Sequence, residues 1–163
     1  DSASTSGYLV PAIEFKKAGI EPSETVFAGR HDNVVTMVYQ GQVDAGATWH
    51  NPPKNGKMDD ARKLVLTQFP DVEEKVRILG FSGDVPNAPW ILRTNLYKDP
   101  DYYQKIKKYI TDGVLEFSQS KEGAAVMAEL YGITGLERTT DEEYAPIVEK
   151  LLAAKKELNA KIK

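Results

Sequence analysis

The sequence predicts an α/β fold, and three observations support this class. In the first half of the chain, short apolar segments bounded by Gly and Pro alternate with segments of helical spacing. In the second half only helical spacing is seen, and the composition changes at residues 85–89, Val-Pro-Asn-Ala-Pro. A chain of 163 residues can bury an ordinary core. We interpret residues 85–89 as a crossing between two lobes.

Three helices are expected in the first half. The first runs over residues 7–18 and stops at Gly19, because Pro11 is tolerated only in or just after the first turn. The second runs over residues 33–40, with Asp32 as its N-cap and Gly41 as its stop. Short strands are expected at residues 25–28, 43–49, 76–81 and 90–93, an exposed loop at 50–57, and a charged helix at 58–66.

Three helices are expected in the second half, each with its own start signal. Asp99 is an N-cap followed by Pro100 at the first helical position, which predicts a helix over residues 101–117. Ser120 caps a second helix that ends near Gly132. Thr140 and Glu143 form a capping box for the last helix, which is expected to run to the C-terminus.

A cluster of hydroxyl side chains lies where the first helix begins. Ser4, Thr5 and Ser6 directly precede Gly7 and Tyr8. The free N–H groups of a first helical turn and the positive end of the helix dipole attract an anion. A plain helix cap is the commoner explanation of such a cluster, and a phosphate-like oxyanion site is the functional alternative. It is not a Walker loop, because the glycine spacing and the lysine are absent.

Two further polar residues flank predicted strands. His31 follows the strand at 25–28 and precedes a helix, which places it at the edge of the sheet where α/β folds bind ligands, as a donor to a ligand oxygen. A surface loop histidine is the alternative. Asp44 begins a strand with small residues at 45–47, and it either faces the cleft or is simply exposed. A Ser/His hydrolase is disfavoured, because no Gly-x-Ser-x-Gly elbow is present.

Composition excludes several classes of function. The net charge of −3 offers no basic footprint for nucleic acid. No apolar run approaches the ~18 residues that span a bilayer. The chain has no cysteine and two histidines, which disfavours disulfides, thiolate catalysis and a histidine-rich metal centre. No cofactor is predicted.

Three segments together resemble one family: DSASTSGYLVP, FAGRHDNVVTMVYQGQVDAGATW and VPNAPWILR. They are similar to the periplasmic substrate-binding proteins of phosphonate, phosphite and phosphate ABC transporters. The resemblance implies a two-lobed type II periplasmic-binding-protein fold, with lobe two at 1–84, a return hinge at 85–89 and the helical C-terminal part of lobe one at 90–163. It also implies a fragment that lacks the first strand of lobe two and the N-terminal half of lobe one.

The resemblance further implies a site and partners. Ser4, Thr5 and Ser6 would bind the oxyanion through hydroxyls and N–H groups, and His31 would donate to another oxygen. Members that bind aminophosphonates place carboxylates after the small-residue strand and in the hinge, where this chain has Trp49-His50-Asn51 and Asn87-Ala88-Pro89. A ligand without a cationic tail is therefore expected. The expected ligand-binding residues are Ser4, Thr5, Ser6, Gly7, Tyr8, His31, Asp44 and Asn51.

Hinge closure around the ligand would then deliver it to ABC transporter permease subunits. The family implies the periplasm, or an extracellular lipoprotein in a single-membrane bacterium. Half a pocket is expected to bind weakly without the missing half. The ligand-sensing domain of a membrane receptor would use the same site and is the main alternative.

Overall fold

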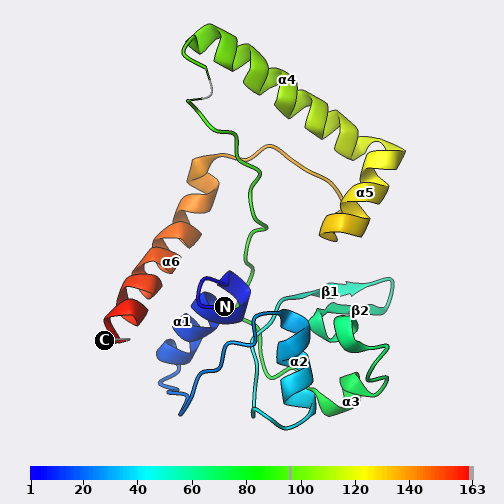
Figure 1. The fold of residues 1–163 in the computed structure, drawn as a ribbon, viewed down its shortest axis with the longest axis vertical. Coiled ribbons are helices and arrows are strands. Elements are labelled where there is room, and N and C mark those ends of the chain that lie inside the picture. The colour runs from blue at the N-terminus through cyan, green and yellow to red at the C-terminus, as the bar shows by residue number, and fades with distance from the viewer. Residues whose placement is uncertain (96, 162–163) are drawn as a thin grey trace. The chain divides into compact units, whose positions relative to one another are not determined.

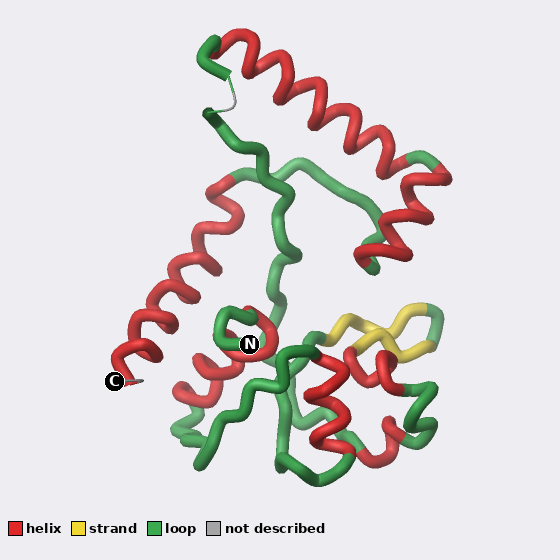
Figure 2. The backbone as a smooth tube through the Cα atoms, in the orientation of Figure 1, coloured by secondary structure: helices red, strands yellow, loops and turns green. Residues whose placement is uncertain are grey.

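The computed structural model describes residues 1–95 and 97–161. It combines helices with a small sheet, which confirms the predicted α/β class at the level of secondary-structure content. Contacts divide the chain into two units: residues 1–85 with 145–163, and residues 86–144. Figures 1 and 2 show the elements of each unit.

The first helical segment begins with a single π-turn, η1 (Thr5–Leu9), and continues as α1 (Val10–Lys17). Ser4 is the N-cap, and its Oγ accepts a hydrogen bond from the Gly7 N–H at 3.1 Å. The turn is wide because the Leu9 N–H reaches back to the Ser4 carbonyl at 2.9 Å. The predicted first helix is confirmed, and Gly19 follows its end with φ +66°.

The second helix, α2 (His31–Tyr39), begins two residues earlier than predicted. Its N-cap is Arg30, not Asp32, because the extended backbone of Arg30 lets its carbonyl accept the Val34 N–H at 3.1 Å. Asp32 lies inside the first turn. Its Oδ1 accepts from the Asn33 N–H at 3.0 Å and pairs with the Arg30 Nε at 3.1 Å. The carboxylate still favours the helix start through the helix dipole.

The strand predictions were wrong in position. Residues 25–28, 43–49, 76–81 and 90–93 are irregular, whereas the predicted loop and helix contain the hairpin β1 (His50–Lys54) and β2 (Lys57–Asp60). The strands pair antiparallel around Asn55 and Gly56, whose φ values of +53° and +71° suit a tight hairpin turn. A strand forms where its backbone N–H and C=O groups pair with a neighbouring strand, and the sheet of the described residues contains only β1 and β2. Leu79 and Ile91, in two of the irregular segments, are 87% and 88% exposed.

The core of the first unit forms where α2 and the short helix α3 (Val72–Lys75) both pack on η2 (Ala61–Val65). The predicted charged helix at 58–66 is therefore part strand and part 3₁₀ helix. The buried cluster and the partly buried side chains around it are Val35, Ala61, Val65, Val72, Tyr39, Trp49, Phe69 and Val76.

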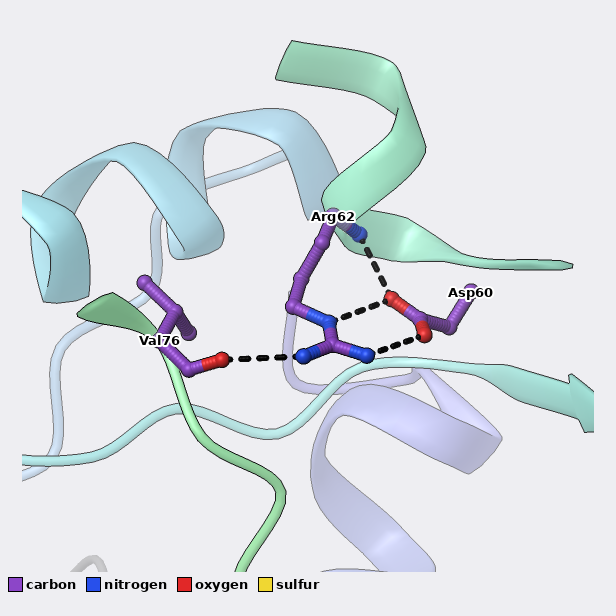
Figure 3. A network of polar contacts seen from close by, with 3 residues as sticks. All are labelled: Asp60, Arg62 and Val76. Carbon is purple, nitrogen blue, oxygen red and sulfur yellow. Dashed lines mark hydrogen bonds and ion pairs between the residues drawn. The ribbon is translucent and has the colours of Figure 1, made fainter. Parts of the chain in front are cut away.

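A buried ion pair closes one side of this core (Figure 3). The Arg62 guanidinium donates to both oxygens of Asp60, at 3.0 and 2.8 Å, and to the Val76 carbonyl at 3.0 Å. Asp60 Oδ1 also accepts the Arg62 N–H at 2.9 Å and so caps η2. Burial acts to raise the pKa of Asp60, but the hydrogen bonds from Arg62 outweigh it and the pKa is lowered. The network therefore joins β2 and η2 to the backbone that follows α3.

The second unit contains α4 (Pro100–Gln119) and α5 (Lys121–Tyr131), which pack on each other. Their predicted caps are confirmed: Asp99 accepts from the Asp101 N–H at 2.9 Å, and Ser120 from the Gly123 N–H at 3.0 Å. A Cβ on Gly123 would lie 1.8 Å from the Phe117 carbonyl oxygen. The sharp corner between α4 and α5 therefore requires glycine at this position.

The last helix, α6 (Asp141–Lys161), belongs to both units by its residues. Half of the predicted capping box is present, because Glu143 Oε2 accepts the Thr140 N–H at 3.4 Å. At its start, the Tyr144 hydroxyl donates to the Asn87 carbonyl at 2.7 Å. The expected continuation of the helix to the C-terminus concerns residues 162–163, which lie outside the described residues.

Candidate functional site

The turn at Ser4–Gly7 presents backbone donors. The Gly7 N–H is taken by Ser4 Oγ, and the N–H groups of Tyr8 and Leu9 are taken by the Ser4 carbonyl, at 3.1 and 2.9 Å. The N–H groups of Thr5 and Ser6 have no hydrogen-bond acceptor within the part of the chain that the structure describes. Their hydroxyls likewise have no protein partner there. These donors lie at the positive end of a helical segment and are free for an anion.

His31 lies directly against this turn. A Cβ added to Gly7 would come within 3.6 Å of His31 Cε1 and 2.9 Å of Ser4 Oγ. Because His31 is the first residue of α2, the starts of two helical segments meet here. Partial burial lowers the pKa of His31. At neutral pH the imidazole is therefore uncharged and can donate one N–H.

An aromatic contact holds the loop before α2 against the same turn. The rings of Tyr8 and Phe27 meet edge to face, with centroids 5.0 Å apart and an interplanar angle of 76°. The loop is also tied to α2, since Asn33 Nδ2 donates to the Ala28 carbonyl at 3.0 Å. Gly29 has φ +79°, which lets the chain turn into the helix. The ring of Tyr8 therefore packs on Phe27.

Asp44 and Asn51 are not brought to this cluster by any contact of the described residues. Asp44 is exposed in an irregular segment. The small residues after it serve packing on α2, because a Cβ on Gly46 would lie 2.4 Å from Val34 Cγ1. Asn51 lies on β1, and its Nδ2 donates to Asp59 Oδ2 at 3.2 Å. A role for either residue in ligand binding stays a prediction.

Two residues that contact predicted site residues were not themselves predicted from the sequence. Phe27 was assigned to a strand, although the aromatic side chain next to Ala-Gly-Arg-His was a visible feature. Asp59 was assigned to a helix, and it pairs with Lys63 while it accepts from Asn51. The Asn55-Gly56 dipeptide, a strong hairpin pattern, would have placed Asp59 opposite Asn51.

The cluster has no nucleophilic triad among the described residues. Among residues 1–95 and 97–161, no hydrogen bond connects His31 to a serine hydroxyl or to Asp32, as a nucleophilic triad requires. In the same residues no group of three His, Cys, Asp or Glu side chains could hold a metal ion. No helix in this part of the chain is both long and apolar enough to cross a bilayer.

Residues 1–144 match the family model of the ABC transporter phosphonate periplasmic substrate-binding proteins. The match includes the Ser4–Gly7 turn and His31. The chain belongs to this family. No solved structure was found to match it. As a member of the phosphonate-binding family, the protein is a substrate-binding component of an ABC transporter for a phosphonate-type ligand, a class that is generally non-enzymatic. The family places it in the periplasm or outside the cell.

Proposed function

We propose that the protein binds a phosphorus oxyanion between the Ser4–Gly7 turn and His31 and delivers it to the permease subunits of an ABC transporter. One observation carries the proposal: His31 Cε1 would lie 3.6 Å from a Cβ on Gly7. This close approach supports a site shared by the imidazole and the unpartnered N–H groups of Thr5 and Ser6, which directly precede Gly7. An oxyanion with several acceptor oxygens can bond to both sides at once.

The ligand we propose has no cationic tail: phosphite, phosphate or a simple alkylphosphonate. The carboxylate next to Asn51 is that of Asp59. It already forms an ion pair with Lys63 and accepts a hydrogen bond from Asn51. In the proposed hinge, residues 87–89 carry no carboxylate, and the Asn87 carbonyl accepts the Tyr144 hydroxyl. An ammonium group would therefore have no free counter-charge at either position.

The proposed organisation is a ligand-binding lobe at 1–84, a return hinge at 85–89 and part of the other lobe at 90–163. The change between contact units at Val85 and Pro86 supports a hinge there. Tyr8, Asp44 and Asn51 are proposed as further ligand contacts. Closure about such a hinge would surround the anion and make binding tighter than one lobe alone allows.

The test is a titration followed by NMR, which detects millimolar as well as micromolar binding. Methylphosphonate, phosphite, phosphate and 2-aminoethylphosphonate are added in turn to ¹⁵N-labelled protein. We expect the amide signals of Thr5, Ser6 and His31 to shift with the first three ligands and less with the fourth. Sulfate at equal concentration controls for general anion effects. Shifts that spread evenly over the surface, or that are equal for sulfate, would contradict the proposal.

A further inference from the structure

Phe27 lies in a segment without regular structure that leads directly into His31. Residues 20–30 connect α1 to α2. At the start of this connection the Ile20 N–H donates to the Phe15 carbonyl at 2.9 Å, and near its end the Ala28 carbonyl accepts Asn33 Nδ2 at 3.0 Å. Between these points, the ring of Phe27 packs edge to face on the ring of Tyr8. Tyr8 lies one residue after Gly7, so the contact joins the two halves of the site.

Phe27 is also exposed, although its side chain is large and apolar. Its side chain is 48% exposed, and neighbouring Val26 is 51% exposed. Burial in a core therefore does not explain its position. The ring contact is directional, and aromatic pairs of this geometry are stabilised beyond the area that they bury.

We propose that Phe27 is a positioning residue for the oxyanion site, because its ring contact with Tyr8 sets how closely His31 approaches the Ser4–Gly7 turn. The inference rests on the proposed function, since it concerns the same site. Phe27 acts through Tyr8 and is four residues before His31. Without the contact, the loop before α2 becomes more mobile. The distance between the His31 imidazole and the N–H groups of the Ser4–Gly7 turn is then no longer fixed. Ligand-binding groups must keep their geometry to within about half an ångström.

The test compares Phe27→Ala with Phe27→Tyr, which keeps the edge-to-face contact, and with Phe15→Ala as a matched control. Phe15 is an exposed phenylalanine of α1 in the same unit. Loss of one aromatic pair predicts about a two- to tenfold weaker affinity for methylphosphonate in Phe27→Ala. Phe27→Tyr and Phe15→Ala should bind as the unchanged protein does.

A double-variant cycle separates positioning from direct ligand contact. If Phe27 acts through Tyr8, Phe27→Ala should cause little further loss of affinity in a Tyr8→Ala background. Equal losses in both backgrounds would overturn the inference. So would unchanged binding by Phe27→Ala when the unchanged protein binds.

A second readout needs no ligand and keeps the inference separate from the proposed function. The pKa of His31 is measured by NMR in each variant. Because burial against the turn lowers this pKa, Phe27→Ala should raise it toward its ordinary value, and Phe15→Ala should leave it unchanged. An unchanged His31 pKa in Phe27→Ala would overturn the inference. If the unchanged protein binds none of the phosphorus oxyanions, the proposed function fails, and the His31 pKa alone decides whether Phe27 positions His31.

Discussion

The imidazole of His31 packs on Gly7, and its Cε1 would lie 3.6 Å from a Cβ at that position. The backbone of Gly7 does not have a positive φ, so the absence of a side chain here serves close approach and not an unusual conformation. The contact joins two residues that lie 24 positions apart in the sequence (31 minus 7). It also makes Gly7 the position at which a single methyl group tests the site.

Replacing Gly7 with Ala should weaken anion binding more than it weakens folding. The new Cβ would lie 2.9 Å from Ser4 Oγ, so the cap must shift, and the stability lost should be about 1 kcal/mol. The displaced turn should lower the affinity for methylphosphonate about tenfold, measured by calorimetry. Gly80→Ala is the control, because nothing lies within 4 Å of its added Cβ. Equal affinities for the two variants would contradict this expectation.

Substitutions of Ser4 should separate capping from binding. Ser4→Ala removes the acceptor of the Gly7 N–H and should cost about 1 kcal/mol of unfolding free energy. Ser4→Asp keeps an acceptor and should retain most of that stability, but its carboxylate repels an anion. Thermal unfolding and phosphonate titration of both variants measure the two effects. Normal phosphonate binding by Ser4→Asp would place the anion elsewhere.

The pKa of His31 should make stability depend on pH. Burial lowers this pKa in the folded protein below its ordinary value of 6.5, so folding favours the neutral ring. The contribution is present above pH 6.5 and is lost as the pH falls through that value toward the folded pKa. Urea unfolding between pH 7.5 and pH 5 should show a larger loss for the unchanged protein than for His31→Gln. If the unchanged protein and His31→Gln lost equal stability between pH 7.5 and pH 5, His31 would not be the source of the pH dependence.

A bound anion should raise the pKa of His31, which burial lowers. An oxyanion next to His31 favours the imidazolium, and its pKa should rise when methylphosphonate is added. NMR titration of the ring protons with and without ligand measures the change. The ring of His50, which packs on Phe81 at a centroid distance of 4.6 Å, is the internal control. A rise of equal size at both rings would indicate a general ionic effect.

The Asp60–Arg62 pair should respond unequally to single and double replacement. Both side chains are largely buried, with 8% and 14% of their surface exposed. Arg62→Met leaves a buried carboxylate without its counter-charge and should cost about 3–5 kcal/mol. Adding Asp60→Asn should recover part of this loss. Lys63→Met, which removes an exposed pair with Asp59, should cost at most about 1 kcal/mol. Denaturant unfolding measures all three.

Gly123 and Gly113 should give opposite results when each is replaced by Ala. A Cβ at Gly123 would meet the Phe117 carbonyl oxygen at 1.8 Å, so the corner between α4 and α5 must open. A Cβ at Gly113, inside α4, meets nothing within 4 Å and should stabilise the helix by about 0.5–1 kcal/mol. Thermal unfolding followed by circular dichroism measures both changes.

The helices α1, α4 and α5 could be predicted because their start and stop are decided locally. Ser4, Asp99 and Ser120 each accept a hydrogen bond from a backbone N–H two or three residues later, and such pairs are visible in the sequence. At α2 the local pattern was misleading. Both Arg30 and Asp32 lie at the helix start, and the backbone conformation of Arg30 made it the cap.

The strands could not be predicted because a strand is defined by its partner. Residues 76–81 and 90–93 have apolar patterns typical of strands, yet among the described residues neither segment pairs with a neighbouring strand. The hairpin at 50–60 forms despite Pro52 and Pro53, because Asn55 and Gly56 supply the turn.

For the proposed site, the sequence by itself predicted the chemistry: three hydroxyls before a helix, a histidine before another, and a match to the phosphonate-binding family. Only the tertiary structure decided which groups meet. It placed His31 on Gly7, packed Phe27 on Tyr8, and left Asp44 and Asn51 without a contact to that cluster. The physical reason is the separation along the sequence of the residues that interact. A cap depends on atoms within one turn, whereas these ring contacts join residues 19 (27 minus 8) or more positions apart, whose approach depends on the path of the connecting loops.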